Sequence, residues 1–260
     1  MAFLLLGAFV GFMAGLLGIG GGGIMVPTLT SIFLLQGVPV EKVVHLALGT
    51  SMASIIATSL ASMRAHHANG GVLWSVVRAV TPGIIVGTFL ATFVAKYISS
   101  AHLAIFFAVF MGAVAVQMFL NKKPKPSREL AGTTGMLAAG SGIGAISALV
   151  SIGGGSLTVP FLTWQNVEIR KAIGTSAAIG LPISIAGTLG YVVNGWANSS
   201  PESYTFGFIY LPAVLLISAT SFFTAPVGAK MAHRLPVGIL KKIFAVLLVV
   251  LGLKMLFSVI

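Results

Sequence analysis

Acidic residues are nearly absent from this chain, in which four glutamates are the only acids among 260 residues. Charged residues of both signs make up 7% of the sequence, whereas 57% of it is hydrophobic, and the mean hydropathy is +1.05. A water-soluble domain of this size could not cover its surface with so few charges. The composition therefore predicts a polytopic membrane protein.

Cysteine is also absent, which excludes disulfides, thiolate metal ligands and cysteine redox chemistry. All four glutamates lie between the predicted spans, at Glu41, Glu129, Glu168 and Glu202. A proton relay or a divalent-cation pathway needs carboxylates inside the membrane, so neither is expected. No catalytic triad, metal-ligand cluster or Walker motif is visible. We therefore predict no enzyme activity, no metal and no cofactor.

The net charge of +11 could indicate a nucleic-acid partner, but the basic residues lie in short loops between apolar runs. The positive-inside rule gives this distribution in membrane proteins, so we expect the lipid bilayer, and no nucleic acid, as a partner. The protein is predicted to lie in the cell (inner) membrane. The loop 121–130, which holds four Lys or Arg residues, is predicted to face the cytoplasm. A linker at 122–130 divides one membrane transport domain, 1–260, into repeat 1 (1–121) and repeat 2 (131–260).

Each half holds three apolar runs long enough to cross a hydrocarbon core of ~30 Å. Each half also opens with a longer apolar element, at about 2–36 and 131–164, which a glycine cluster interrupts. The run Met1–Leu17 resembles a signal peptide but lacks a basic n-region, so we interpret it as mature structure. The three runs lie at about 43–62, 72–95 and 101–120 in the first half, and 172–192, 206–228 and 238–258 in the second.

The glycine cluster occurs twice, so that Gly20–Gly23 matches Gly153–Ser156 at an offset of 133 residues. Val-Pro follows both copies, with the prolines at Pro27 and Pro160. Glycine runs break helices, and paired breaks in the two halves of a membrane protein point to a transport site.

Bare backbone N–H groups at such a break can bind an anion at the start of the following helix. Ser156 is a candidate N-cap of the second of these helices, and both prolines are expected near the first turn, where a missing N–H costs least. The alternative is that the small residues only permit close helix packing. The candidate substrate-binding residues are Gly20, Gly21, Gly22, Gly23, Gly153, Gly154, Gly155 and Ser156.

The basic residues also favour a topology in which 131–164 begins and ends on one side of the membrane. Loops 164–171 and 229–242 carry basic residues, whereas loop 193–205 carries none. The glycine element is then a re-entrant hairpin or two short crossings. With three further crossings per half, consecutive halves must insert in opposite orientations. The predicted fold is an all-α polytopic membrane protein of two inverted repeats, each a glycine-broken re-entrant helix pair plus three transmembrane helices, about eight segments in all.

A second motif, Ala-x-Gly-Thr-Ser, is also duplicated, at Ala47–Ser51 and Ala172–Ser176. Paired hydroxyls early in a crossing can donate hydrogen bonds to the oxygens of an anion. The alternatives are bonding to carbonyls of the same helix or to a neighbouring helix. The candidate substrate-binding hydroxyls are those of Thr50, Ser51, Thr175 and Ser176.

Two basic side chains stand at equivalent positions just before this motif, His45 and Arg170. Each could draw anions toward the site or act in gating, and a histidine can change its charge between about pH 5 and 8. The alternative is that both simply lie at the membrane interface. Segment 62–75 is assigned to a solvated loop with Arg64, His66 and His67.

In the glycine clusters followed by Val-Pro-x-Leu, and in Ala-x-Gly-Thr-Ser at the next span, the chain resembles the TauE/SafE family of sulfite and organosulfonate exporters. The resemblance covers nearly the whole chain. It implies a bacterial-type inner-membrane permease of about eight segments for small sulfur-containing anions. The residues of both motifs then fall on the family's repeat motifs, although the first copy has Gly23 where the second has Ser156.

The predicted function is secondary transport, with export of sulfite or an organosulfonate by alternating access. The predicted partner is a small anionic substrate, and a homodimer is left open by the apolar surfaces. Two alternatives within transport are uptake of another small anion or a neutral sulfur compound, and a channel. A third is a membrane scaffold or assembly protein without transport of its own.

Overall fold

The computed structural model describes residues 1–18, 20–120, 131–200, 202–231 and 237–259, and these ranges hold ten α-helices. The predicted linker at 122–130 lies outside the described residues. The helices of the first half are α1 (Ala2–Leu17), α2 (Gly22–Leu35), α3 (Val40–Ala68), α4 (Trp74–Tyr97) and α5 (Ser100–Leu120). Those of the second half are α6 (Thr133–Val150), α7 (Gly155–Trp164), α8 (Ile169–Gly195), α9 (Leu211–Met231) and α10 (Val237–Val259).

The helices confirm the all-helical, multi-pass prediction. Each predicted apolar run coincides with one helix, and both predicted glycine elements are helix pairs broken at the glycines. Within the described ranges, six helices are long and apolar enough to cross a membrane: α3, α4, α5, α6, α8 and α9. The arms that follow the breaks are too short to cross at 1.5 Å per residue, because α2 has 14 residues (~21 Å) and α7 has 10 (~15 Å).

One boundary prediction is wrong. The loop expected at 62–75 begins only after Ala68, so that Arg64, His66 and His67 belong to the last turns of α3. His66 is buried, with 3% of its surface exposed. The charges had suggested a solvated loop, but the apolar and hydroxyl residues before them continue the helix and carry His66 into the protein interior.

Helices of the two halves pack against one another in equivalent pairs. α1 lies along α9 as α4 lies along α6, while α3 packs on α8 and α5 on α10. Small residues bring these helices close together, as is common in membranes. On α1, a Cβ at Gly11 would lie 2.5 Å from Cα of Ser221 on α9. On α6, a Cβ at Gly144 would lie 2.6 Å from the Ile84 carbonyl of α4.

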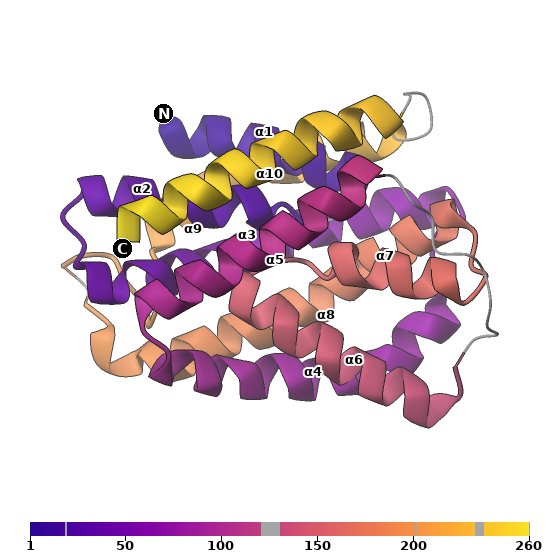
Figure 1. Cartoon of the computed structure of the whole chain (residues 1–260), viewed down its shortest axis with the longest axis horizontal. Coiled ribbons are helices and arrows are strands. Elements are labelled where there is room, and N and C mark those ends of the chain that lie inside the picture. Colours follow the sequence, from indigo (N-terminus) through magenta and orange to yellow (C-terminus); the bar gives the residue numbers. More distant parts are fainter. Residues whose placement is uncertain (19, 121–130, 201, 232–236, 260) are drawn as a thin grey trace.

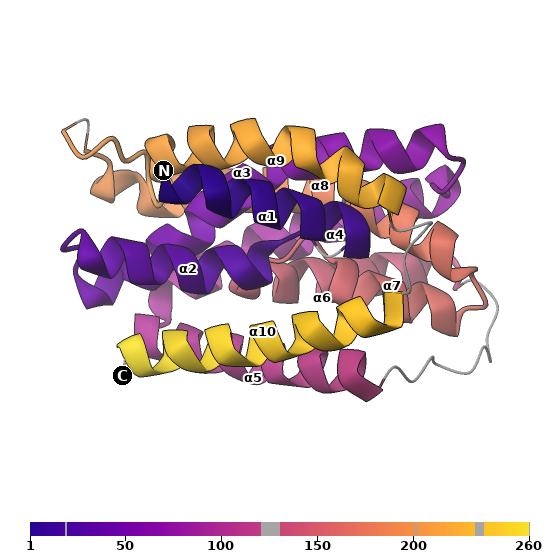
Figure 2. The same ribbon diagram turned by 90° about the horizontal axis from the view of Figure 1, so that it is seen from above.

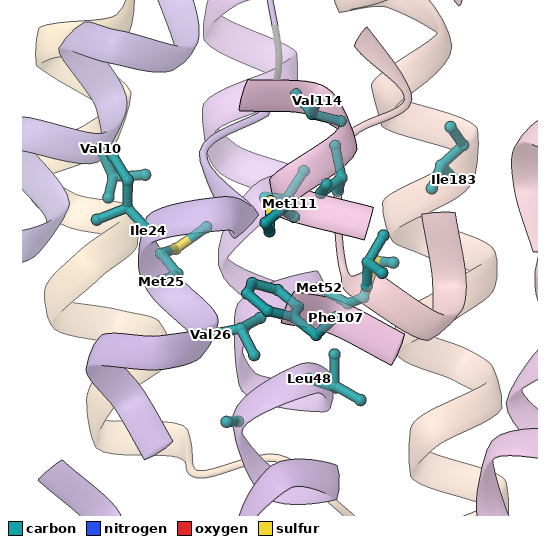
Figure 3. Close-up of a cluster of buried hydrophobic side chains, with 14 of the residues drawn as sticks. Val10, Ile24, Met25, Val26, Leu48, Met52, Phe107, Met111, Val114 and Ile183 are labelled. Carbon is teal, nitrogen blue, oxygen red and sulfur yellow. The ribbon is translucent and has the colours of Figure 1, made fainter. Parts of the chain in front are cut away.

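The two broken elements open toward opposite ends of the molecule. In Figure 2, α1 runs from the N terminus at the left toward the right, and α2 returns to the left. In Figure 1, α6 enters from the right and α7 returns to the right. Both breaks therefore lie in the middle of the bundle. Apolar side chains of α2, α3 and α5, among them Val26, Met52 and Phe107, are buried there (Figure 3).

Candidate functional site

Both breaks depend on backbone conformations that glycine adopts freely. Gly18 ends α1 with φ of 69°, and its N–H donates to the Ala14 carbonyl at 2.8 Å. Gly20 and Gly21 follow with φ of 75° and 79°, and α2 begins at Gly22. A side chain at these positive φ values would be strained.

The second break resembles the first, but Gly153, the equivalent of Gly20, does not have a positive φ. Ser151 occupies the place of Gly18 at φ 50°, and its hydroxyl donates to the Leu48 carbonyl of α3 at 3.0 Å. Gly154 then has φ of 76°, and α7 begins at Gly155. The hydrogen bond to α3 holds a non-glycine residue in a conformation that it rarely adopts.

The two breaks touch each other through their backbones. A Cβ at Gly20 would lie 2.6 Å from the Cα of Gly153, and one at Gly153 would lie 2.9 Å from the Cα of Gly20. A Cβ at Gly22 would overlap the carbonyl oxygen of Ser151. The structure thus brings together the two glycine clusters, which lie far apart in the sequence.

The N-termini of α2 and α7 start at this crossing without a side-chain cap. Their N-caps are Gly21 and Gly154, and neither has a side-chain cap hydrogen bond. The prediction that Ser156 caps α7 is wrong, because Ser156 lies inside the helix at its second residue. Pro27 and Pro160 are each the sixth helical residue, so they lie in the second turn, directly after the first turn near which the sequence predicts them.

A small hollow lies beside the crossing, toward the C-terminal half of α3. Its volume is about 10 Å³, roughly the room that one water molecule needs. Hydroxyl-bearing residues of α3 form one wall, and glycines and alanines form the others. The lining residues are Ala14, Gly18, Gly20, Thr58, Ser59, Ser62, Gly153 and Ala177.

The α3 hydroxyls of this hollow were not predicted from the sequence. Thr58 donates to the Ser221 hydroxyl of α9 at 2.9 Å, whereas the buried hydroxyl of Ser62 has no hydrogen-bond partner among the described residues. A signal was available: Thr50, Ser54, Thr58 and Ser62 recur every four residues, which places them along one side of a helix.

The predicted threonines bond across the two halves. Thr50 on α3 accepts a hydrogen bond from the N–H of Tyr210, just before α9, at 3.0 Å. Thr175 on α8 accepts one from the N–H of Leu73, just before α4, also at 3.0 Å. Each threonine therefore binds the start of an equivalent helix in the opposite half. Each hydroxyl is the acceptor in its bond, so the bond does not use the hydroxyl's own proton.

The predicted serines of the same motif differ from each other. Ser176 is buried and donates to the carbonyls of Ile173, at 2.8 Å, and Gly18, at 3.3 Å. Through Gly18 it touches the first break. Ser51 is also fully buried, and its hydroxyl has no partner in the part of the chain that is described.

The two predicted basic residues lie apart from the hollow, whose lining includes neither. His45 is buried, and its Nε2 lies 3.0 Å from the Ala95 carbonyl of α4. Its ring centroid is 5.2 Å from that of Phe208. Arg170 is exposed at the start of α8. A role of these residues in attracting or gating anions stays a prediction.

We expect Thr50→Val and Thr175→Val each to lower the free energy of unfolding by about 1–3 kcal/mol, because each leaves a buried backbone N–H without its acceptor. Thr50→Ser and Thr175→Ser keep the hydroxyl and should retain most of that stability. Thermal unfolding of the purified protein in detergent measures the difference. Thr30→Val is the matched control, since the buried Thr30 hydroxyl has no partner among the described residues. Equal melting temperatures for all three valine variants would contradict the capping role.

Comparison with known proteins identifies the family of this chain. A model of the family described as "Sulfite exporter TauE/SafE" matches residues 3–255. The chain belongs to the TauE/SafE family. The match covers both glycine breaks and all ten described helices, apart from the first residue of α1 and the last residues of α10, so the chain is a membrane transporter of this family. No solved structure matches the chain.

Three relatives of this TauE/SafE protein are similar to it over nearly their full length. A probable membrane transporter protein of Haemophilus influenzae is 40% identical over 97% of this chain and 96% of its own. One of Methanocaldococcus jannaschii is 29% identical over 97% of this chain and 94% of its own. One of Bacillus subtilis is 25% identical over 99% of this chain and 100% of its own. All three are described as transporters and none as an enzyme.

Proposed function

We propose that this TauE/SafE protein is a secondary transporter that exports a small sulfur-containing anion, sulfite or an organosulfonate, across the inner membrane. The observation that carries the proposal is the meeting of the two glycine breaks at the centre of the bundle. Irregular backbone at membrane depth is tolerated where it faces protein or a watery cavity, and here it borders a hollow with hydroxyl donors.

The anion would bind where two uncapped helix N-termini converge. Both α2 and α7 begin at the crossing, and the positive ends of their dipoles favour negative charge. The proposed contacts are the glycines of the two breaks, with Ser156 and the hydroxyls of Thr50, Ser51, Thr175 and Ser176. Because backbone dipoles replace a permanent positive charge, the anion can also be released.

The arrangement of the helices supports two inverted repeats with re-entrant broken elements. The α1–α2 and α6–α7 pairs open toward opposite ends (Figures 1 and 2), and equivalent helices pack in equivalent pairs. Two opposed halves around one central site suit alternating access by rocking of one bundle against the other.

The end of the molecule nearest the hollow is proposed to face the cytoplasm. The hollow lies toward the C-terminal half of α3, and exposed basic residues gather beyond it, at Arg64, Arg170 and Lys171. Cytoplasmic ends of membrane helices carry such an excess of Lys and Arg. An anion would then enter the hollow from the cytoplasm, as export requires.

Transport by the purified protein in liposomes tests the proposal. Vesicles loaded with radiolabelled sulfite or taurine should show saturable efflux that protein-free vesicles lack, and acetate should not compete. Flux that rises linearly with concentration would indicate a channel instead. If no sulfur oxyanion or sulfonate moves in either direction, the proposed substrate class is wrong.

A further inference from the structure

One side chain that lines the hollow beside the breaks has no hydrogen-bond partner among the described residues. Ser62 is 3% exposed and lines the hollow, and its hydroxyl has no partner among the described residues. A buried polar group without a partner costs free energy. Ser59 lines the same wall and is 4% exposed. These two hydroxyls are placed to form hydrogen bonds with a ligand bound in the hollow.

The corresponding place in the other half contains large apolar side chains at two positions where the hollow has small or polar ones. At the offset of 125 residues that relates Thr50 to Thr175, Thr58 corresponds to Ile183, and Ala177 to Met52. The Cδ1 of Ile183 lies 2.6 Å from where a Cβ on Gly154 would stand. Figure 3 shows Met52 and Ile183 among the buried apolar side chains.

Met52 is the second of these large apolar side chains. Gly187 stands where Ser62 stands in the first half, and a Cβ there would lie 3.0 Å from the sulfur of Met52. A thioether thus occupies the space that Ala177 leaves open on the other side. The second place also holds buried hydroxyls, at Ser147, Ser151 and Ser184, the equivalents of Ala14, Gly18 and Ser59. The two places therefore differ in their apolar volume and in which positions carry a hydroxyl.

The donor set of the hollow limits the charge it can hold. Its lining contains hydroxyls, glycines and alanines but neither an acidic nor a basic side chain. The cost of moving an ion out of water rises with the square of its charge in the Born description, and it is already large for a single charge. A few neutral donors offset that cost far better for a singly charged anion than for a doubly charged one.

We propose that Ser62, together with Ser59, contacts the transported anion directly, and that this uncharged site selects a singly charged oxyanion such as a sulfonate over a dianion such as sulfate. The inference rests on the proposed function and refines it, because it assigns the binding contacts to α3 hydroxyls outside the duplicated motif. The hollow has room for about one water molecule at about 10 Å³, so it widens when the anion enters.

The test compares Ser62→Ala with Ser147→Ala in liposomes, using methanesulfonate, whose charge does not depend on pH in the working range. Both serines are buried with hydroxyls that lack a partner in the described chain, but Ser147 does not line the hollow. Ser62→Ala should raise KM for methanesulfonate about tenfold, the loss expected for one hydrogen bond to a charged group. Ser147→Ala should leave KM unchanged.

Two further readings make the test decisive. Against transport of labelled methanesulfonate, the inhibition constant of sulfate should be at least about tenfold higher than that of unlabelled methanesulfonate. The reason is that each added charge raises the desolvation cost. Ser62→Ala should keep the wild-type melting temperature, because it removes a hydroxyl that bonds to nothing within the described fold.

The outcomes separate this inference from the proposed function. If the wild-type protein transports methanesulfonate but Ser62→Ala and Ser59→Ala match its KM, the assigned contacts are wrong. Equal losses in Ser62→Ala and Ser147→Ala would overturn the assignment of the contact to the hollow, and competition by sulfate as strong as by methanesulfonate would overturn the charge selection. If the wild-type protein transports no sulfur oxyanion at all, it is the proposed function that fails.

Discussion

Replacing Gly22 by alanine is expected to prevent assembly of the two broken elements into the folded transporter. The added Cβ would overlap the carbonyl oxygen of Ser151 in the opposite break. That oxygen belongs to the backbone of a residue already at positive φ, so it cannot move as the end of a side chain could. Overpacking that displaces backbone costs on the order of 3 kcal/mol or more, a large fraction of the stability of a domain.

The adjacent Gly23 offers a matched control. A Cβ there would meet the Leu248 Cδ2 at 2.9 Å and the Met111 sulfur at 3.2 Å, both in flexible side chains that can shift. Gly142→Ala in α6 adds a Cβ with nothing within 4 Å and should be neutral or stabilising. Melting temperature and size-exclusion profile in detergent distinguish the three variants. Wild-type values for Gly22→Ala would show that the breaks do not touch as described.

Gly49→Ala is expected to lower the free energy of unfolding by the second-largest amount among the substitutions considered. The close contact at Gly49 explains why the Ala-x-Gly-Thr-Ser motif has a glycine there. A Cβ at Gly49 would overlap the carbonyl oxygen of Phe208 and lie 3.1 Å from the Cβ of Tyr191. The segment before α9 would have to withdraw from α3, and the bond between Thr50 and the N–H of Tyr210 would be lost with it. We expect roughly 2–3 kcal/mol of destabilisation from overpacking.

The consequence should extend to transport, since α9 starts at this contact. Maximal transport per folded protein and the melting temperature should both fall in Gly49→Ala. Gly112→Ala in α5 is the control, because a Cβ there has nothing within 4 Å. Gly174→Ala should behave like Gly49→Ala, as its Cβ would overlap the Gly71 carbonyl before α4. A stable, fully active Gly49→Ala protein would refute this account of the motif.

Much of the helix layout could be predicted because it depends on local sequence. Apolar runs of about membrane length become helices, and the glycines at 20–23 and 153–155 mark the two breaks. The wrong boundary at the end of α3 also came from reading local sequence. Arg64 and His67 are charged or polar and exposed, which favours a loop, but the buried His66 between them shows that helix packing outweighed the local polarity.

The candidate site was only partly predictable. The duplicated glycines correctly located the centre of the molecule, but the hydroxyls of Thr50 and Thr175 each bond a backbone N–H in the opposite half. The sequence could not reveal those partners, because Tyr210 and Leu73 lie 160 and 102 residues away. The hollow at Ser59 and Ser62 has no counterpart in the duplicated motifs, and a search for motifs alone passes over it.

The sequence by itself determined that this is a membrane protein of two similar halves, each with a helix broken at glycines. Composition and periodicity are enough for this, because the bilayer imposes length and apolarity on every span. Only the tertiary structure decided that the breaks touch at Gly20 and Gly153 and that a hollow lined by Ser59 and Ser62 lies beside them. Such outcomes depend on the shapes of side chains that meet across the bundle, and close packing is a property of the whole set of neighbours.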